Sequence, residues 1–296
     1  MGIAERCEMR IVGLMLARDE SWVLPASIDA ALRWVDRLVF MHNGLVDDST
    51  FATIMAYDHA YKGKMHFDLW SDGDHWLEMD ARQKSLEIGR SLGGTHFAII
   101  DADEILTANL TSSVRHWFDV LQPGQCLDLP MIAPWKSLDV YSPHTQGVIT
   151  LGFADAPHLA WRPRGEEKYH YHARAPQGET GMRITPLRNQ DQGGVFHLQY
   201  ASEKRLVWKH RHYMMSERVR WNYPVEEINR KYHWWTVPPH GTDLKPIPAE
   251  WWGDYPKASI TLDHEPWHAQ ACREMWRKYG AGTFQGLDLF GWAGGE

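Results

Sequence analysis

Apolar and polar residues alternate in blocks over the first 110 residues, and this pattern predicts strands and helices in turn. Four apolar runs predict strands, at residues 9–17, 37–42, 64–69 and 95–100. The first of them is nearly continuous, as expected for a strand that is buried on both faces. Three segments between the runs predict helices, from about residue 21 onward, at 50–61 and at 76–92. Pro25 is tolerated near a helix start, and Gly93-Gly94 is typical of a helix end.

The order of these elements predicts a parallel sheet covered by helices. In such sheets, ligands bind beyond the carboxyl ends of the strands. Polar loops follow the first three predicted strands, at residues 18–20, 43–49 and 71–75. The fourth strand runs directly into the acidic cluster Asp101-Ala102-Asp103-Glu104. We therefore expect the functional site at this edge of the sheet.

The rest of the chain shows a less regular pattern. Short apolar runs with Pro and Gly predict mixed or antiparallel strands over residues 121–200, and residues 202–235 are expected to be helical in part. A Pro- and Trp-rich segment at 236–256 predicts an extended wrapping segment, and 266–279 predicts a last helix. We expect a catalytic domain at 1–235 (a nucleotide-binding half at 9–110 and an acceptor half at 111–235). A C-terminal extension at 236–296 is expected to wrap around it.

Charge and cysteine content exclude several classes of protein. The 296 residues carry a net charge of −7, and residues 1–120 hold 11 Lys and Arg against 19 Asp and Glu, which argues against a uniformly basic nucleic-acid binder. The three cysteines form neither a disulfide framework nor a zinc pattern. No apolar run reaches the roughly 18 residues of a membrane span, and no secretory signal pattern is present. We expect a reduced, cytoplasmic protein.

The acidic cluster carries the strongest chemical signal. Asp101 and Asp103 lie two residues apart after a buried strand, where two carboxylates can share a hard cation. A helix cap or a solvated turn is the alternative interpretation of such a pair.

Residues 97–106 (FAIIDADEIL) resemble the strand and Asp-x-Asp segment of family 2-like, GT-A-fold glycosyltransferases. Further segments resemble successive motifs of the same family, at residues 12–20, 39–50, 78–86 and 194–209. The resemblance implies an α/β, GT-A-like fold, with a mostly parallel sheet flanked by helices and a C-terminal helical or extended extension. His42 departs from the family, which usually has an acidic residue there that contacts the donor nucleotide.

Carried over residue by residue, the resemblance implies a Mn²⁺ or Mg²⁺ ion bound by Asp103. Asp101 would bind the ribose, or the metal through water, and His197 would be a late ligand of the metal or the diphosphate. The residues expected at the nucleotide sugar are Arg18, Asp19, Asn43, Asp72, Arg82, Asp101 and Lys204. A UDP-sugar is the favoured donor, although His42 leaves base recognition open.

The resemblance further implies an inverting transfer, in which a carboxylate or His takes the acceptor proton. Glu166, Glu167 and Asp191 are the candidates for this base, His172 is a weaker one, and spacing does not choose among them.

A saccharide is the favoured acceptor. Basic residues interleaved with aromatic ones over 203–235 leave a modified DNA base as a second acceptor. A nucleotidylyltransferase and a non-catalytic sugar- or nucleic-acid-binding protein are the alternative functions.

Overall fold

The computed structural model describes residues 8–42, 49–61, 63–70, 78–143, 147–162, 174–232 and 243–294. Its contacts divide the chain into two compact units. Unit 1 consists of Met1–Met131, Gly147–Phe196 and Ala249–Ile260. Unit 2 consists of Ile132–Gln146, His197–Pro248 and Thr261–Glu296.

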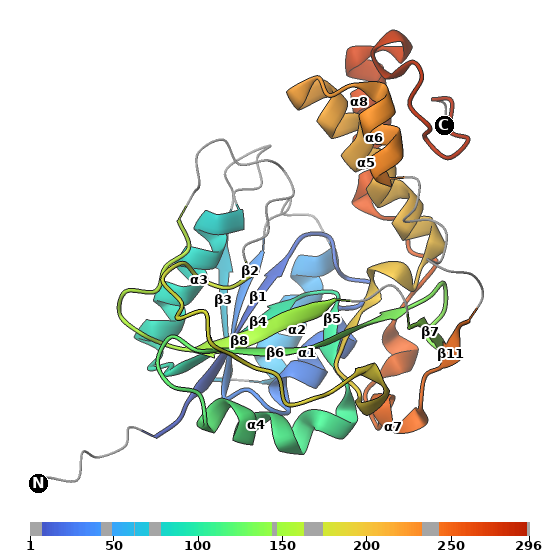
Figure 1. The fold of residues 1–296 in the computed structure, drawn as a ribbon. Helices are drawn as coiled ribbons and strands as arrows, with labels where there is room; N and C mark the ends of the chain where they lie inside the picture. Colours follow the sequence, from blue (N-terminus) through green and yellow to red (C-terminus); the bar gives the residue numbers. More distant parts are fainter. Residues whose placement is uncertain are drawn as a thin grey trace, which may run out of the picture. The chain divides into compact units, whose positions relative to one another are not determined.

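The sheet of unit 1 begins with four parallel strands (Figure 1). They lie in the order β3 (Met65–Leu69), β2 (Arg37–His42), β1 (Ile11–Ala17) and β4 (His96–Asp101). The next two strands are antiparallel neighbours, β8 (Val148–Ala154) beside β4 and β6 (Cys126–Pro134) beside β8. Each of the four strands predicted over the first 110 residues is present.

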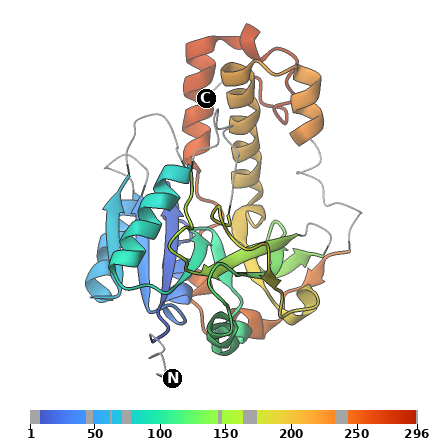
Figure 2. The same cartoon turned by 60° about the vertical axis from the view of Figure 1, so that its left-hand side comes forward.

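Helices cover both faces of this sheet (Figures 1 and 2). Side chains of β1 point alternately to the two faces, as the pleat requires. Ile11 and Met15 pack with α1 (Leu24–Leu32), α2 (Ser49–Ala60) and α4 (Thr111–Asp119). Leu14 and Leu16 pack on the other face with α3 (Glu78–Ser91). All seven residues of β1 are buried, which explains its continuous apolar run. The predicted fold class, a mostly parallel α/β sheet flanked by helices, is confirmed.

Gly152 allows β8 to lie against β4. It pairs with Ala98, and a Cβ atom added at Gly152 would lie 2.3 Å from the backbone oxygen of Phe97. The ladder between the two strands runs from the pair His96 and Ala154 to the pair Ala98 and Gly152.

Short elements complete unit 1. They are β5 (Glu104–Leu106), η1 (Ala108–Leu110), β9 (Arg183–Ile184), η2 (Gln190–Gln192), β10 (Val195–His197), α7 (Ala249–Trp252) and η5 (Lys257–Ser259). The ring of Phe196 stacks on Trp252 with centroids 4.6 Å apart, which fixes α7 to β10. The segment predicted to be extended and wrapping therefore contains a short helix within the core of unit 1.

Unit 2 is mainly helical. It contains β7 (Val140–Ser142), η3 (Leu198–Tyr200), α5 (Glu203–Trp221), α6 (Val225–Tyr232), β11 (Lys245–Pro246), α8 (Trp267–Tyr279) and η6 (Ala281–Phe284). Ser202 caps α5 by accepting a hydrogen bond from the backbone N–H of Arg205. Asn222, in the left-handed conformation at φ 49°, ends α5, and α6 follows three residues later.

Cys126 and Cys272 are free thiols buried in the cores of unit 1 and unit 2 respectively. Burial is the largest influence on each thiol, and it raises the pKa of both to about 12. Within the parts of the chain that the structure describes, every helix is too short or too polar to cross a lipid bilayer.

Candidate functional site

The acidic cluster forms a tight turn at the carboxyl edge of the parallel strands. Asp101 is the last residue of β4, and Glu104 is the first residue of β5. The backbone N–H of Asp101 donates to Glu104 Oε2 at 3.0 Å, which closes the turn. Leu16 of β1 lies beside Asp101 in the sheet register, so the residues after β1 begin level with this acidic turn.

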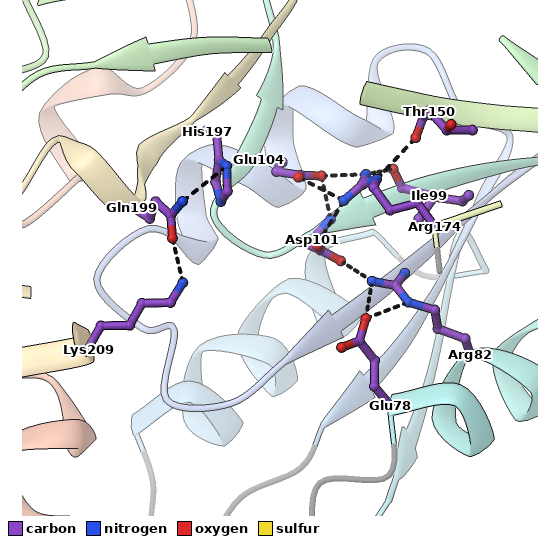
Figure 3. Close-up of polar contacts among 10 residues, drawn as sticks. All are labelled: Glu78, Arg82, Ile99, Asp101, Glu104, Thr150, Arg174, His197, Gln199 and Lys209. Carbon is purple, nitrogen blue, oxygen red and sulfur yellow. Dashed lines mark hydrogen bonds and ion pairs between the residues drawn. The ribbon is translucent and has the colours of Figure 1, made fainter. Parts of the chain in front are cut away.

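Two arginines hold the carboxylate of Asp101 (Figure 3). Arg82 Nη2 donates to Oδ1 at 2.9 Å, and Arg174 Nη1 donates to Oδ2 at 2.9 Å. The Asp101 side chain is 32 % exposed, whereas that of Arg82 is 3 % exposed. The carboxylate is thus fixed on one side by two charges and open to solvent on the other.

Arg82 is anchored from within α3. Its Nε donates to Oε1 of Glu78, four residues earlier on the same helix, at 2.8 Å. Burial lowers the pKa of Arg82, but the charges of Asp101 and Glu78 outweigh burial and leave that pKa raised. Arg82, which the resemblance placed in the nucleotide pocket, lies buried behind Asp101 in this structure.

Arg174 contacts both ends of the acidic turn. Its Nη1 donates to Glu104 Oε1 at 2.9 Å, and its Nη2 donates to Glu104 Oε2 at 2.8 Å. Glu104 is 2 % exposed. Burial raises the pKa of Glu104 to about 7; the Arg174 charge works against this rise, and the Asp101 charge adds to it.

Asp103 and Asp19 also lie near the carboxyl edge. Asp103 is 7 % exposed, in the turn between β4 and β5. Arg18 and Asp19 follow β1 directly and are half-buried. Asp19 adopts the left-handed conformation at φ 51°, which few residues other than Gly, Asn and Asp tolerate. Strained backbone of this kind often occurs at functional sites.

The other predicted site residues lie elsewhere or outside the described part of the chain. Asp191 is exposed in η2, where its N–H donates to Asn189 Oδ1 at 3.1 Å. Lys204 is exposed in unit 2, where its Nζ donates to the backbone oxygen of Asp263 at 3.4 Å. Four residues lie outside the described ranges: Asn43, Asp72, Glu166 and Glu167. His172, the weaker candidate base, also lies outside them.

His197 belongs to unit 2, and Gln199 links it to Lys209 (Figure 3). Lys209 Nζ donates to Gln199 Oε1 at 2.8 Å. The Gln199 amide nitrogen faces His197 Nδ1 at 3.5 Å, the long end of the hydrogen-bond range. The metal role of His197 stays a prediction.

The atoms available as metal ligands determine how well the acidic turn could bind a divalent cation. Across the described ranges, no three side chains of the His, Cys, Asp or Glu type gather closely enough to hold a metal ion. Both oxygens of Asp101 already accept from guanidinium groups, so a cation bound there would lie next to two positive charges. Two neighbouring guanidinium groups make Asp101 unfavourable as a direct ligand of a cation, and the metal role of Asp103 stays a prediction.

The sequence analysis named Asp101, Asp103 and Arg82, but it did not name Arg174, whose side chain makes five hydrogen bonds at the acidic turn. Arg174 lies in the region without regular periodicity, and no local motif surrounds it. Its partners Asp101 and Glu104 are 73 and 70 residues away in sequence, so only the fold brings them together.

Several solved structures are similar to this chain. GalNAc-T7 with UDP, GalNAc and Mn²⁺ matches over 77 % of this chain and 56 % of its own, at 9 % identity and a TM-score of 0.37. The bifunctional glycosyltransferase WbbM matches over 49 % of this chain and 27 % of its own, at 13 % identity and a TM-score of 0.27. Mannose-1-phosphate geranyltransferase from Thermus thermophilus matches over 76 % of this chain and 68 % of its own, at 11 % identity and a TM-score of 0.29.

The chain thus spans little more than half the length of the GalNAc-T7 chain. No protein-family model and no curated protein matches the chain. Likenesses at these TM-scores carry no argument about family, substrate or mechanism.

Proposed function

We propose that this protein transfers a sugar from a nucleotide-diphosphate donor to an acceptor hydroxyl. The observation that supports this proposal is the acidic turn at the carboxyl edge of the parallel strands, with Asp101 held rigidly and open on one side. This edge is where open α/β sheets bind ligands. The ordered motifs that resemble family 2-like glycosyltransferases lead to this same turn.

Asp101 is suited to accept a hydrogen bond from a neutral hydroxyl group of the donor, such as a ribose hydroxyl. Its negative charge is balanced by Arg82 and Arg174, so a neutral partner adds a hydrogen bond without a new charge imbalance. Because both guanidinium groups fix the carboxylate before the ligand arrives, little side-chain freedom is lost on binding. Arg18 and Asp19 follow the neighbouring strand and are proposed to contact the same nucleotide.

Asp103 is proposed to hold Mn²⁺ or Mg²⁺. When bound, such an ion stabilises negative charge on the departing diphosphate. His197 and Lys204 remain proposed diphosphate contacts, and a UDP-sugar remains the proposed donor.

The transfer is proposed to invert the configuration at the anomeric carbon. A carboxylate then takes the proton of the acceptor hydroxyl as that oxygen attacks. The candidates for this base are Glu166, Glu167 and Asp191.

A saccharide hydroxyl is the proposed acceptor. The basic and aromatic residues of α5 that suggested a nucleic-acid strand are partly engaged within unit 2. Arg211 packs over the ring of Trp208 at 4.4 Å and donates to the backbone oxygen of Leu289 at 2.7 Å. Arg211 is therefore engaged with Trp208 and Leu289, which leaves fewer of its donors for a nucleic-acid strand.

Thermal unfolding with UDP-, GDP-, dTDP- and CMP-linked sugars, with and without Mn²⁺, tests the proposed function. A ligand at 100 times its Kd adds about 2.7 kcal/mol of stability. We expect one nucleotide class to raise the Tm in the wild type, with Mn²⁺ increasing the shift. Asp103→Ala should lose the Mn²⁺-dependent part, whereas Asp119→Ala, which changes an exposed acid at the end of α4, should keep it. Absence of a shift with every donor would refute the proposal.

A further inference from the structure

Arg174 uses every hydrogen-bond donor of its side chain inside the protein. A guanidinium group carries five N–H donors. In Arg174, Nη1 donates to Asp101 and Glu104, and Nη2 donates to Glu104 and to the backbone oxygen of Ile99 at 3.0 Å. The remaining donor, Nε, points to the backbone oxygen of Thr150 at 3.2 Å. A positive charge thus lies at the acidic turn with no donor left for a phosphate group.

Arg174 lies where strands β4 and β8 meet the acidic turn, so its five hydrogen bonds connect the sheet to that turn. The β4–β8 ladder reaches the pair Ala98 and Gly152, and the Arg174 guanidinium bonds to the carbonyl groups of Ile99 and Thr150, just beyond that pair. It therefore links the sheet to the acidic turn, with two strand carbonyls on one side and two carboxylates on the other (Figure 3).

The charges of the cluster are nearly balanced. Three carboxylates (Glu78, Asp101 and Glu104) face two guanidinium groups (Arg82 and Arg174). Removing the Arg174 guanidinium group would leave the buried Glu104 carboxylate without its cationic partner, which is far more costly than losing an exposed ion pair.

We propose that Arg174 is a positioning residue that fixes Asp101 and Glu104 and affects nucleotide binding only through Asp101. This inference depends on the proposed function, because it takes Asp101 as the group that contacts the donor. Lysine cannot replace Arg174 in this role. An ammonium group offers three donors around one point, whereas the four partner groups of Arg174 surround a planar fork.

Arg174→Lys tests the inference against Arg90→Lys as a matched control. Arg90 makes a similar half-buried set of bonds away from the acidic turn, donating to both oxygens of Asp155 and to the backbone oxygens of Ala156 and Leu159. Calorimetric titration would measure the affinities of the two variants for UMP and UDP, with GMP and GDP in parallel. We expect Arg174→Lys to weaken mono- and diphosphate binding by the same factor, roughly tenfold or more. Arg90→Lys should leave both affinities unchanged.

The ratio of the two losses separates positioning from direct contact. A residue that contacts the phosphates would lower the affinity for the diphosphate much more than that for the monophosphate, and this outcome would overturn the inference. The double variant Asp101→Asn/Arg174→Lys gives a second criterion. If Arg174 acts through Asp101, the double variant binds no more weakly than Asp101→Asn alone; losses that multiply would contradict that pathway.

Amide hydrogen exchange provides a measurement that needs no ligand. The Asp101 N–H donates to Glu104, which Arg174 fixes, so exchange at residues 101–104 should become faster in Arg174→Lys and not in Arg90→Lys. Unchanged exchange would overturn the positioning role. If the wild type bound none of these four nucleotides and none of the donors of the thermal-unfolding panel, the proposed function would fail, and the exchange rates would still decide whether Arg174 orders the turn.

Discussion

Asp101 illustrates how the surroundings of a single carboxylate decide its chemistry. Placed at the end of a buried strand, it would be costly as an isolated charge. Arg82 and Arg174 neutralise it with hydrogen bonds of 2.9 Å each. This pairing leaves the carboxylate oriented and charge-balanced, which suits a hydroxyl partner better than a cation.

Asp19 allows the backbone and the carboxylate of a predicted site residue to be tested separately. At φ 51°, Asp19→Ala should be about 1–2 kcal/mol less stable than Asp19→Gly, because alanine keeps the Cβ atom that disfavours the left-handed conformation and lacks the polar group that lets Asp adopt it. Asp19→Gly should lose none, since glycine adopts this conformation freely. Urea unfolding would measure the difference.

Both Asp19 variants lack the carboxylate, so they should weaken nucleotide binding equally. If nucleotide affinity instead fell only in the less stable variant, and Asp19→Gly bound nearly as tightly as wild type, the Asp19 carboxylate would have no part in nucleotide binding.

The residues of the site differ in how far the sequence could predict them. Asp101 and Asp103 were predictable because a buried apolar run leads directly into them. The interpretation of Arg82 as a pocket residue missed its partner Glu78, although their spacing of four residues on a helix favours such a pair. Arg174 was not predictable, because its contacts span strands and turns that only the tertiary structure brings together.

Among the elements, the parallel strands were predictable one by one, whereas the antiparallel ones were predicted only as mixed or antiparallel strands somewhere over residues 121–200. Strands buried on both faces give long apolar runs, and the prediction for Arg37–His42 agrees with the observed bounds of β2. The strands β6 and β8 contain Pro130, Pro134 and Gly152, which resemble turn signals in a sequence. Within the single helical region predicted over 202–235, Asn222 ends α5 before α6 begins.

Gly152 is the position at which the pairing of β8 with β4 is most sensitive to a side chain. Gly152→Ala should destabilise the protein by about 1–3 kcal/mol, because the new Cβ atom would meet the backbone oxygen of Phe97 and the ring of Phe118. Gly147→Ala, one residue before β8, has open space around the new atom and should be neutral. Chemical denaturation would compare the two, and an equal effect would contradict the close approach.

For the whole molecule, the chain passes between its two units repeatedly. Ala249–Ile260 lies in the region expected to form a C-terminal extension, but it belongs to unit 1. Ile132–Gln146 lies in the expected acceptor half, but it belongs to unit 2. Patterns local to the sequence locate helices and strands, but they do not show which unit a returning segment joins. That depends on packing such as the stacking of Phe196 on Trp252.

His210 makes the stability of the molecule depend on pH. Burial, with a smaller contribution from Lys209, lowers the pKa of His210 to about 3. Between about pH 6.5 and 3 the unfolded chain therefore binds a proton that the folded chain does not, so stability falls as the pH falls. The limiting slope is about 1.4 kcal/mol per pH unit for one proton.

His210→Gln should remove this part of the acid dependence. Urea unfolding at pH 7, 6, 5 and 4 would measure it, with the exposed His116→Gln as the control. Parallel acid profiles for wild type and His210→Gln would contradict the neutral, buried state of His210.

The two buried cysteines allow the opening of each unit to be measured by alkylation. Cys126 lies in one unit and Cys272 in the other, and a thiol whose pKa is about 12 reacts hardly at all while it is enclosed. Alkylation at either position therefore requires the surrounding unit to open. Mass spectrometry of the two peptides, after brief exposure of the native protein to iodoacetamide, would record the opening rate of each unit separately in one sample.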